Sequence, residues 1–304
     1  MVMIKRMLAL LGSGALAILL LRQAETAAQA VRDGVQLCLT SVIPALFPFF
    51  AVSSLLVALG AAEAAGRALA RPFGQLFRCG GAGCAALLLG LVGGYPVGAR
   101  TAAELVRRGE LSPAEGARLL TFCNNAGPAF AIGVAGVSVF GSARTGVWLY
   151  LLHCVAALLT GLLFCRRPLP VTAMPKRPVP PQTGLTGQFL RAVEGAVSAM
   201  ARVCGFVVFF LVLLRLAEGL IGPLPPLAAG VLELTNGILR LTPDRRGFVT
   251  AAALLGWGGL SVHCQTAAVT AGSGISLRLY LPAKAVQAAL SAGLAALLAP
   301  YLLP

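Results

Sequence analysis

A long apolar stretch without a single charge is the strongest constraint on how this chain can fold. Residues 35–60 contain no Asp, Glu, Lys or Arg over 26 positions, and about 20 apolar residues suffice to cross the hydrocarbon core of a bilayer. Charged residues make up only 11% of the chain, whereas soluble domains carry about 25%. A soluble fold would have to expose the apolar excess as large patches. The sequence therefore excludes an ordinary soluble protein and predicts an all-α polytopic membrane protein.

The charge balance fits the same class. The chain has 24 Lys and Arg against 10 Asp and Glu, a net charge of +14. Its basic residues lie between apolar runs and do not form one basic face, so we expect no nucleic-acid partner. Lys and Arg concentrate in cytoplasmic loops of membrane proteins, and a basic excess is also compatible with an anionic solute. The expected partners are the lipid bilayer and a small anionic solute, and a homo-oligomer is compatible with the pattern.

Composition divides the chain into four segments. Residues 1–34 form an N-terminal membrane helix or signal-like segment, because an apolar run follows two basic residues. Residues 35–165 and 191–304 are two membrane repeats. Residues 166–190 are a proline-rich basic linker, which the positive-inside rule places in the cytoplasm. Within the second repeat, residues 189–202 are expected to form an amphipathic segment and residues 203–221 a span.

Glycines, prolines and amides interrupt three apolar runs at positions where straight helices would otherwise cross the membrane. The runs Gly93–Gly98 and Gly258–Ser261 predict re-entrant hairpins, and Asn124–Pro128 predicts a broken helix. Ser112, Pro113 and Glu115 mark a helix start. Irregular backbone at membrane depth survives only where protein or a water-filled cavity surrounds it.

Shifting the sequence by 165 positions superposes Gly93–Gly94 on Gly258–Gly259 and Thr101 on Thr266. Each half then consists of a span, an interfacial helix, a Gly-Gly hairpin and a span. Three full spans separate the starts of the two halves, so the second half is expected to be inverted, as in secondary transporters. One group of basic residues falls on the wrong side of this topology: Arg240, Arg245, Arg246, Arg278 and Lys284.

Two blocks of motifs carry a family resemblance. The first is Gly94-Tyr95-Pro96-x-Gly98-Ala99 followed by Phe122-x-Asn124-Asn125-x-Gly127-Pro128; the second is Glu233-x-Thr235-x-Gly237 followed by Gly258-Gly259-Leu260-Ser261. They resemble the YlbJ-type sporulation integral membrane proteins, over roughly residues 35 to 300. Those proteins carry nucleoside-recognition, or Gate, domains related to concentrative nucleoside transporters. The resemblance implies a role in spore formation, with dipicolinate as the expected cargo, at a bacterial cell or forespore membrane.

Candidate solute-binding residues lie at the predicted breaks, where backbone N–H groups and polar side chains can face a solute. They are Gly93, Gly94, Tyr95, Pro96, Gly98, Arg100, Thr101, Asn124, Asn125, Gly127, Pro128, Glu233, Thr235, Asn236, Gly258, Gly259, Ser261, His263, Gln265 and Thr266.

Each polar candidate also has a structural alternative. Arg100 binds solute or pairs with Glu104, four residues on. The asparagines bind solute or hold helices together, and the glycines bind solute or allow close packing. Glu233 binds a coupling ion or is solvated at the interface. His153 and His263 are expected to be packed rather than to ligate a metal.

The pattern predicts a secondary transporter of a small anionic or heteroaromatic solute. A nucleoside carrier and a non-transporting scaffold for spore assembly are the alternatives. No enzyme signature, cofactor motif or metal-ligand spacing occurs in the sequence. The coupling ion is expected to be a proton or sodium.

Overall fold

Every regular element in the described part of the chain is a helix. The computed structural model describes residues 2–59, 61–166 and 184–302. This confirms the all-α prediction. Within the described residues, four helical segments are long and apolar enough to cross a membrane, and a bent pair near the N-terminus makes a fifth if the pair is one span. The four are α8 (Ala143–Phe164), α9 (Leu185–Ile221), the pair α12 (Arg245–Trp257) and α13 (Gly259–Thr270), and α14 (Tyr280–Leu302). Most of the proline-rich linker lies outside the described residues.

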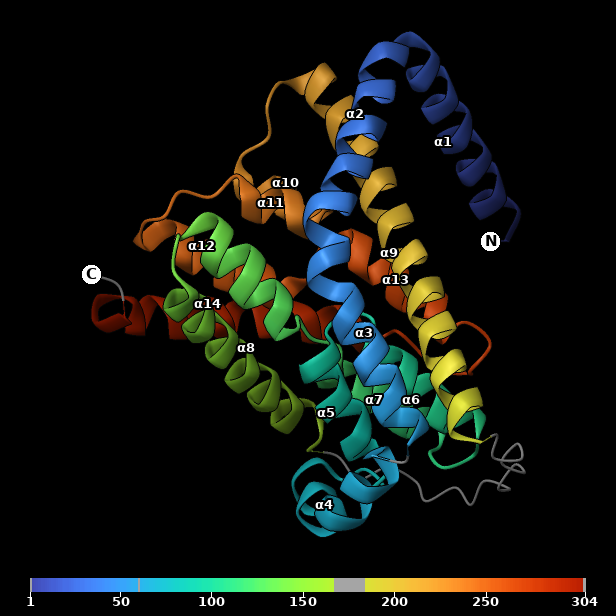
Figure 1. The fold of residues 1–304 in the computed structure, drawn as a ribbon. Helices are drawn as coiled ribbons and strands as arrows, with labels where there is room; N and C mark the ends of the chain where they lie inside the picture. The colour runs from blue at the N-terminus through green and yellow to red at the C-terminus, as the bar shows by residue number, and fades with distance from the viewer. Residues whose placement is uncertain (1, 60, 167–183, 303–304) are drawn as a thin grey trace.

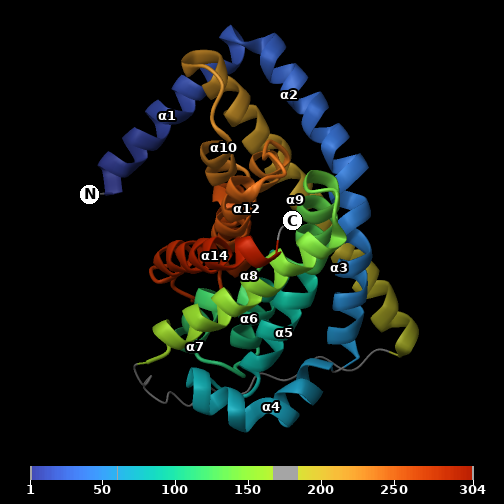
Figure 2. The same ribbon diagram turned by 90° about the vertical axis from the view of Figure 1, so that its left-hand side faces the viewer.

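The N-terminal half begins with two helices that meet at a sharp bend (Figure 1). Helix α1 covers Val2–Arg22 and α2 covers Ala24–Leu37, and their axes differ by 93°. A π-helical turn, η1 (Cys38–Val42), joins α2 to α3 (Ile43–Ala58). The uncharged run at 35–60 is therefore part of a longer helical segment that begins in α2, and the π-helical turn η1 is the irregular part of that segment. Helices α2 and α3 run along α9, as Figures 1 and 2 both show.

Helix α9 joins two predicted segments. The segment predicted to be amphipathic (189–202) and the predicted span (203–221) lie in one continuous helix of 37 residues. At about 1.5 Å per residue, such a helix is roughly 55 Å long, well beyond the roughly 30 Å hydrocarbon core. The sequence of α9 changes at Arg202, from a polar first half to an apolar second half.

Helix α4 (Ala61–Phe77) lies across one end of the molecule, at the bottom of both ribbon views (Figures 1 and 2). One face of α4 is anchored by an aromatic cluster. Phe77 stacks on Phe122 with ring centroids 4.6 Å apart, and Phe73 packs 5.1 Å from Phe77. Leu69 and Leu76 on α4 stay exposed. This arrangement is the one expected of an amphipathic helix at a membrane interface.

Two pairs of short helices fold back on themselves. Helices α5 (Gly83–Gly93) and α6 (Val97–Arg107) pack side by side around a break at Gly94. Helices α10 (Pro226–Leu232) and α11 (Leu234–Leu239) do the same around Glu233. Both hairpins close through facing glycines. A Cβ added to Gly90 would lie 3.0 Å from the Cα of Gly98, and one added to Gly237 would collide with Gly230.

A broken helix follows each hairpin. Helix α7 (Pro113–Cys123) starts at the predicted capping box, in which Ser112 and Glu115 bond reciprocally. It is interrupted at residues 124–128 and resumes as the π-helix η2 (Ala129–Val139). The second broken helix is the pair α12 and α13, interrupted at Gly258.

The break at Gly258 is therefore not the expected hairpin. The chain runs on through it, and Arg245–Thr270 forms a single candidate span. Gly258 and Gly259 have φ values of +91° and +80°, which interrupt the helix without reversing its direction. By order along the chain, the α5–α6 hairpin then corresponds to the α10–α11 hairpin, and the α7–η2 break corresponds to the α12–α13 break. The 165-residue shift paired a hairpin with a broken helix because both contain Gly-Gly. The inversion of the two halves stays a prediction.

Candidate functional site

The two halves meet at a buried group of polar side chains, which we call the central cluster. It consists of Tyr95, Asn124, Asn125, His263, Thr266, Tyr280, Lys284 and Gln287. All except the partly buried Tyr95 are buried. They come from the α5–α6 tip, from the α7–η2 break, from α13 and from α14.

Lys284 is the only lysine or arginine in the central cluster. Its side chain has no exposed surface. Its Nζ donates to the Gln287 side-chain oxygen at 2.7 Å and to the Asn124 backbone carbonyl at 3.0 Å. The Tyr95 hydroxyl lies 3.4 Å away, and Nζ sits 5.3 Å from the centroid of the Tyr95 ring. Within the described residues no carboxylate forms an ion pair with Lys284.

The backbone break at Asn124 and Asn125 is held in place by α13 and α14. The Asn124 amide donates to the Thr266 hydroxyl at 2.8 Å and to the Tyr280 hydroxyl at 3.1 Å. The Gln287 amide donates to the Asn125 side-chain oxygen at 3.0 Å. Buried amides in a bilayer need such partners. The interruption in one half is therefore supported by side chains from the other half.

Tyr95 connects the first hairpin to the second broken helix. Its hydroxyl donates to the Leu255 carbonyl near the end of α12 at 2.8 Å. A Cβ added to Gly258 would lie 3.2 Å from the Tyr95 ring. The predicted tips at 94 and 258 thus come together, although only the first is a hairpin.

Four buried polar atoms around this centre have no hydrogen-bond partner within the described part of the chain. They are Asn124 Oδ1, His153 Nδ1, His263 Nε2 and Ser291 Oγ. Buried polar groups are normally satisfied, and each exception requires an explanation such as a water, an ion or a ligand. A water, an ion or a solute would satisfy these four atoms.

The glycine candidates act through their backbones. A Cβ on Gly94, whose φ is +75°, would lie 2.9 Å from the Gly127 nitrogen. A Cβ on Gly98 would collide with the Cys123 carbonyl. At Gly259 the nearest atom would be the Leu234 nitrogen, 3.0 Å away. Each hairpin tip therefore packs directly against the broken helix that follows it.

Other candidates lie outside the central cluster. Glu233 is 2% exposed, so it is not solvated. Its carboxylate instead caps α11 by accepting from Thr235 N at 3.2 Å and Asn236 N at 2.8 Å. Thr101 bonds to a carbonyl in its own helix, and Ser261 accepts from the Gln265 amide. Gly93 ends α5, and Pro128 precedes η2.

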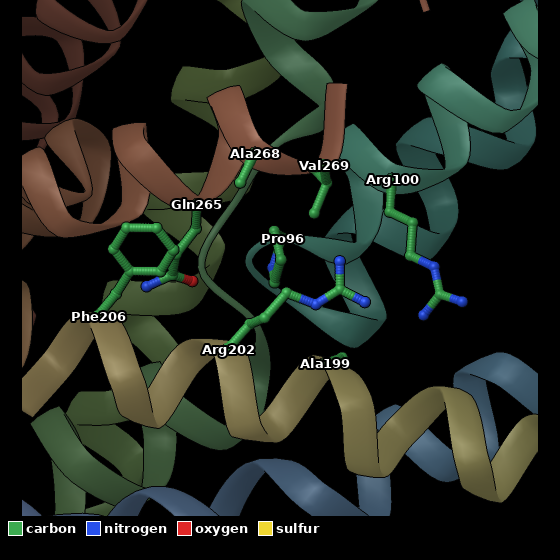
Figure 3. Close-up of a pocket in the computed structure, with 8 residues that line it drawn as sticks. All are labelled: Pro96, Arg100, Ala199, Arg202, Phe206, Gln265, Ala268 and Val269. Carbon is green, nitrogen blue, oxygen red and sulfur yellow. The ribbon is translucent and has the colours of Figure 1, made fainter. Parts of the chain in front are cut away.

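Arg100 is not buried at the centre. It is exposed on α6 and lines a surface pocket together with Pro96 and Gln265 (Figure 3). The structural alternative for Arg100, a pair with Glu104, is not formed. Glu104 makes ion pairs with Arg107 and Arg108 instead.

Both histidines are buried and packed, as expected. His153 Nε2 accepts from the Ala126 backbone at 3.1 Å, and His263 Nδ1 lies 3.1 Å from the Tyr280 hydroxyl. No group of three His, Cys, Asp or Glu side chains suited to a metal ion occurs in the described residues.

Sequence reasoning missed Lys284, Gln287 and Tyr280, because the last span was taken as plain apolar helix. Lys284 was assigned to the basic residues on the wrong side of the membrane, whereas the structure places it inside the protein. A signal was present in the sequence. Residues 280, 284, 287 and 291 are polar and recur at helical spacing, so they form one polar stripe on an apolar helix.

Comparison with known proteins shows two similarities. Residues 39–143 match the Gate family, described as nucleoside recognition. The matched segment is about a third of the chain, and the apolar helices make the chain an integral membrane protein. It is also 26% identical over 310 residues to the sporulation integral membrane protein YlbJ of Bacillus subtilis (strain 168), a match that covers 85% of this chain and 74% of the relative. The resemblance drawn from the motifs is therefore confirmed. No solved structure matches the chain.

Proposed function

We propose that the protein is a secondary transporter of a small anionic solute, which binds at the central cluster. The observation that carries the proposal is Lys284, a fully buried lysine without a carboxylate partner in the described structure. A charge inside a membrane protein is costly and usually functional. An anionic solute would supply the countercharge that the protein itself does not provide there.

The position of Lys284 supports transport rather than static binding. Its direct contacts include the tip of the first hairpin, Tyr95, and the first broken helix, at Asn124. Discontinuous helices that meet at a polar site are the elements from which secondary transporters build their binding sites. The cluster is enclosed by these elements, so a solute can reach Lys284 only if one of them moves.

The expected cargo is dipicolinate, whose two carboxylates flank a ring nitrogen. One carboxylate would pair with Lys284, and the Asn124 and Gln287 side chains offer hydrogen-bonding groups nearby. An aromatic pair lies at the edge of the cluster: the rings of Trp257 and His263 meet edge-on, with their centroids 4.5 Å apart. These rings would accept the flat face of a heteroaromatic solute. The similarity to a sporulation membrane protein supports a role in sporulation, and dipicolinate is the cargo that the sequence resemblance implies.

A nucleoside is the second candidate, because the matching family is described as nucleoside recognition. Amides and hydroxyls of the kind found in the cluster suit ribose and base edges. A buried lysine favours an anion over a neutral nucleoside, so we rank dipicolinate above a nucleoside as the cargo.

Uptake by the purified protein in liposomes tests the proposal. Labelled dipicolinate should accumulate, pyridine-2-carboxylate should compete weakly because it lacks one carboxylate, and uridine should not compete. Uptake of uridine without uptake of dipicolinate would establish the nucleoside alternative. If neither solute enters, the protein is a non-transporting scaffold and the proposal is wrong.

A further inference from the structure

A second basic site lies on the surface of the protein, away from Lys284. The pocket in Figure 3 is lined by Pro96, Arg100, Ala199, Arg202, Phe206, Gln265, Ala268 and Val269. The guanidinium groups of Arg100, on α6, and Arg202, on α9, both extend into the space between these helices (Figure 3). Gln265, on α13, also lines the pocket and is only 4% exposed, and its amide lies beside Phe206 (Figure 3).

The two arginines lack an acidic partner. Within the described residues neither forms an ion pair. Arg100 makes one long contact, 3.5 Å, to the Gly195 carbonyl. Arg202 donates to the Ser198 hydroxyl at 2.8 Å and to the Ser198 carbonyl at 3.3 Å. Two cations that share a pocket repel each other, and an anion between them would relieve that repulsion. Guanidinium groups also match carboxylate oxygens in a planar, two-point geometry.

The pocket and the central cluster are lined by consecutive residues of the same two elements. Pro96 lines the pocket, and Tyr95, its neighbour, lies beside Lys284. Gln265 lines the pocket, and its neighbour Thr266 bonds to Asn124. Both of these elements are interrupted, namely the α5–α6 tip and the second broken helix. Movement of either element would connect the two sites.

The pocket is more accessible than the central cluster. Arg100 and Arg202 are both exposed, whereas Lys284 is fully buried. A soluble anion would therefore meet the two arginines before it reached Lys284.

We propose that the Arg100–Arg202 pocket is an outer docking site for the carboxylate solute, from which it passes to Lys284. This inference rests on the proposed transport function. Two arginines bind a carboxylate oxygen and a phosphate oxygen by the same hydrogen bonds. The headgroup of an anionic lipid could therefore occupy the pocket in place of the solute.

The test uses initial rates of dipicolinate uptake in vesicles of phosphatidylcholine alone, with solute on the linker side. Arg100→Gln and Arg202→Gln should each raise KM about tenfold, the effect of losing one charge-assisted hydrogen bond, and leave Vmax near that of the wild type. The KM of the wild type should rise with salt more steeply than that of the double variant. Arg144→Gln, which removes an exposed arginine at the start of α8, is the matched control and should have no effect.

An unchanged KM in the double variant would overturn the docking site and leave the transport function standing. An effect seen only when anionic lipid is added to the vesicles would assign the pocket to a lipid headgroup and overturn the proposal. Dipicolinate binding to the detergent-solubilised protein is measured in parallel by calorimetry. If the wild type binds without transporting, and the double variant loses binding, the site stands while the transport function fails. If the wild type does neither, both are wrong.

Discussion

Replacing Lys284 with methionine should remove function while leaving stability nearly unchanged. Methionine keeps a chain of similar length but removes the charge and all three donors. The Asn124 carbonyl and the Gln287 oxygen, bonded at 3.0 and 2.7 Å, would lose their partner, at a cost of about 1–3 kcal/mol each. Burial of an ammonium group without a countercharge costs several kcal/mol, and the substitution relieves that cost. The two effects oppose each other, so the net change should stay within about 2 kcal/mol.

Gln287→Met should destabilise the protein more than Lys284→Met, because both of its effects on the free energy of unfolding have the same sign. It leaves the charge of Lys284 in place with one acceptor fewer and removes the donor to Asn125. We expect a loss of about 3–5 kcal/mol, which at roughly 2 °C per kcal/mol lowers Tm by about 6–10 °C.

Thermal unfolding in detergent, followed by tryptophan fluorescence, compares the two variants. Lys284→Met should unfold within about 4 °C of the wild type, at roughly 2 °C per kcal/mol. Equal destabilisation by both substitutions would refute the reasoning, because Lys284 would then be a structural group and not an uncompensated charge.

Two further predictions concern the breaks and the topology. Gly94→Leu and Gly259→Leu should abolish uptake without preventing membrane insertion, because both positions have positive φ and an added Cβ would meet backbone. Gly133→Leu is the control, since an added Cβ there meets nothing within 4 Å. Normal uptake by Gly94→Leu and Gly259→Leu would show that these two glycines are incidental. Single cysteines at positions 142 and 183, in a cysteine-free background, should be labelled from opposite sides of the membrane, and labelling of both from one side would exclude the inverted arrangement.

Local chemistry made several parts of the fold predictable. The helix start at Ser112 and Glu115 follows from side-chain capping within four residues. The interruptions at Gly94, Asn124 and Gly258 follow from residues that cannot continue a helix. Each of these features depends on neighbours in sequence, so a single chain suffices to find it.

The direction of the chain after each interruption was not predictable from the same residues. Gly94 begins a hairpin, whereas the Gly258 break continues a span. The difference arises from packing, since α6 returns along α5 through facing glycines at 90 and 98. The matching hairpin in the second half turns at Glu233, which lacks a Gly-Gly signature altogether.

Part of the central cluster was predicted from the sequence. Asn124, Asn125, Tyr95 and Thr266 were identified because they lie at or near the interruptions, and they do lie at the centre. Lys284 escaped notice because its helix is continuous and apolar on average. Only the spacing of polar residues along α14 could have revealed it.

Uptake of labelled dipicolinate by liposomes that contain either the wild type or Lys284→Met tests the central claim most directly. Arg144→Met, which removes a positive charge from an exposed position, serves as the control. The account predicts uptake by the wild type and the control, and none by Lys284→Met at equal amounts of folded protein. Uptake by Lys284→Met at the rate of the wild type would contradict the claim that the buried lysine binds the solute.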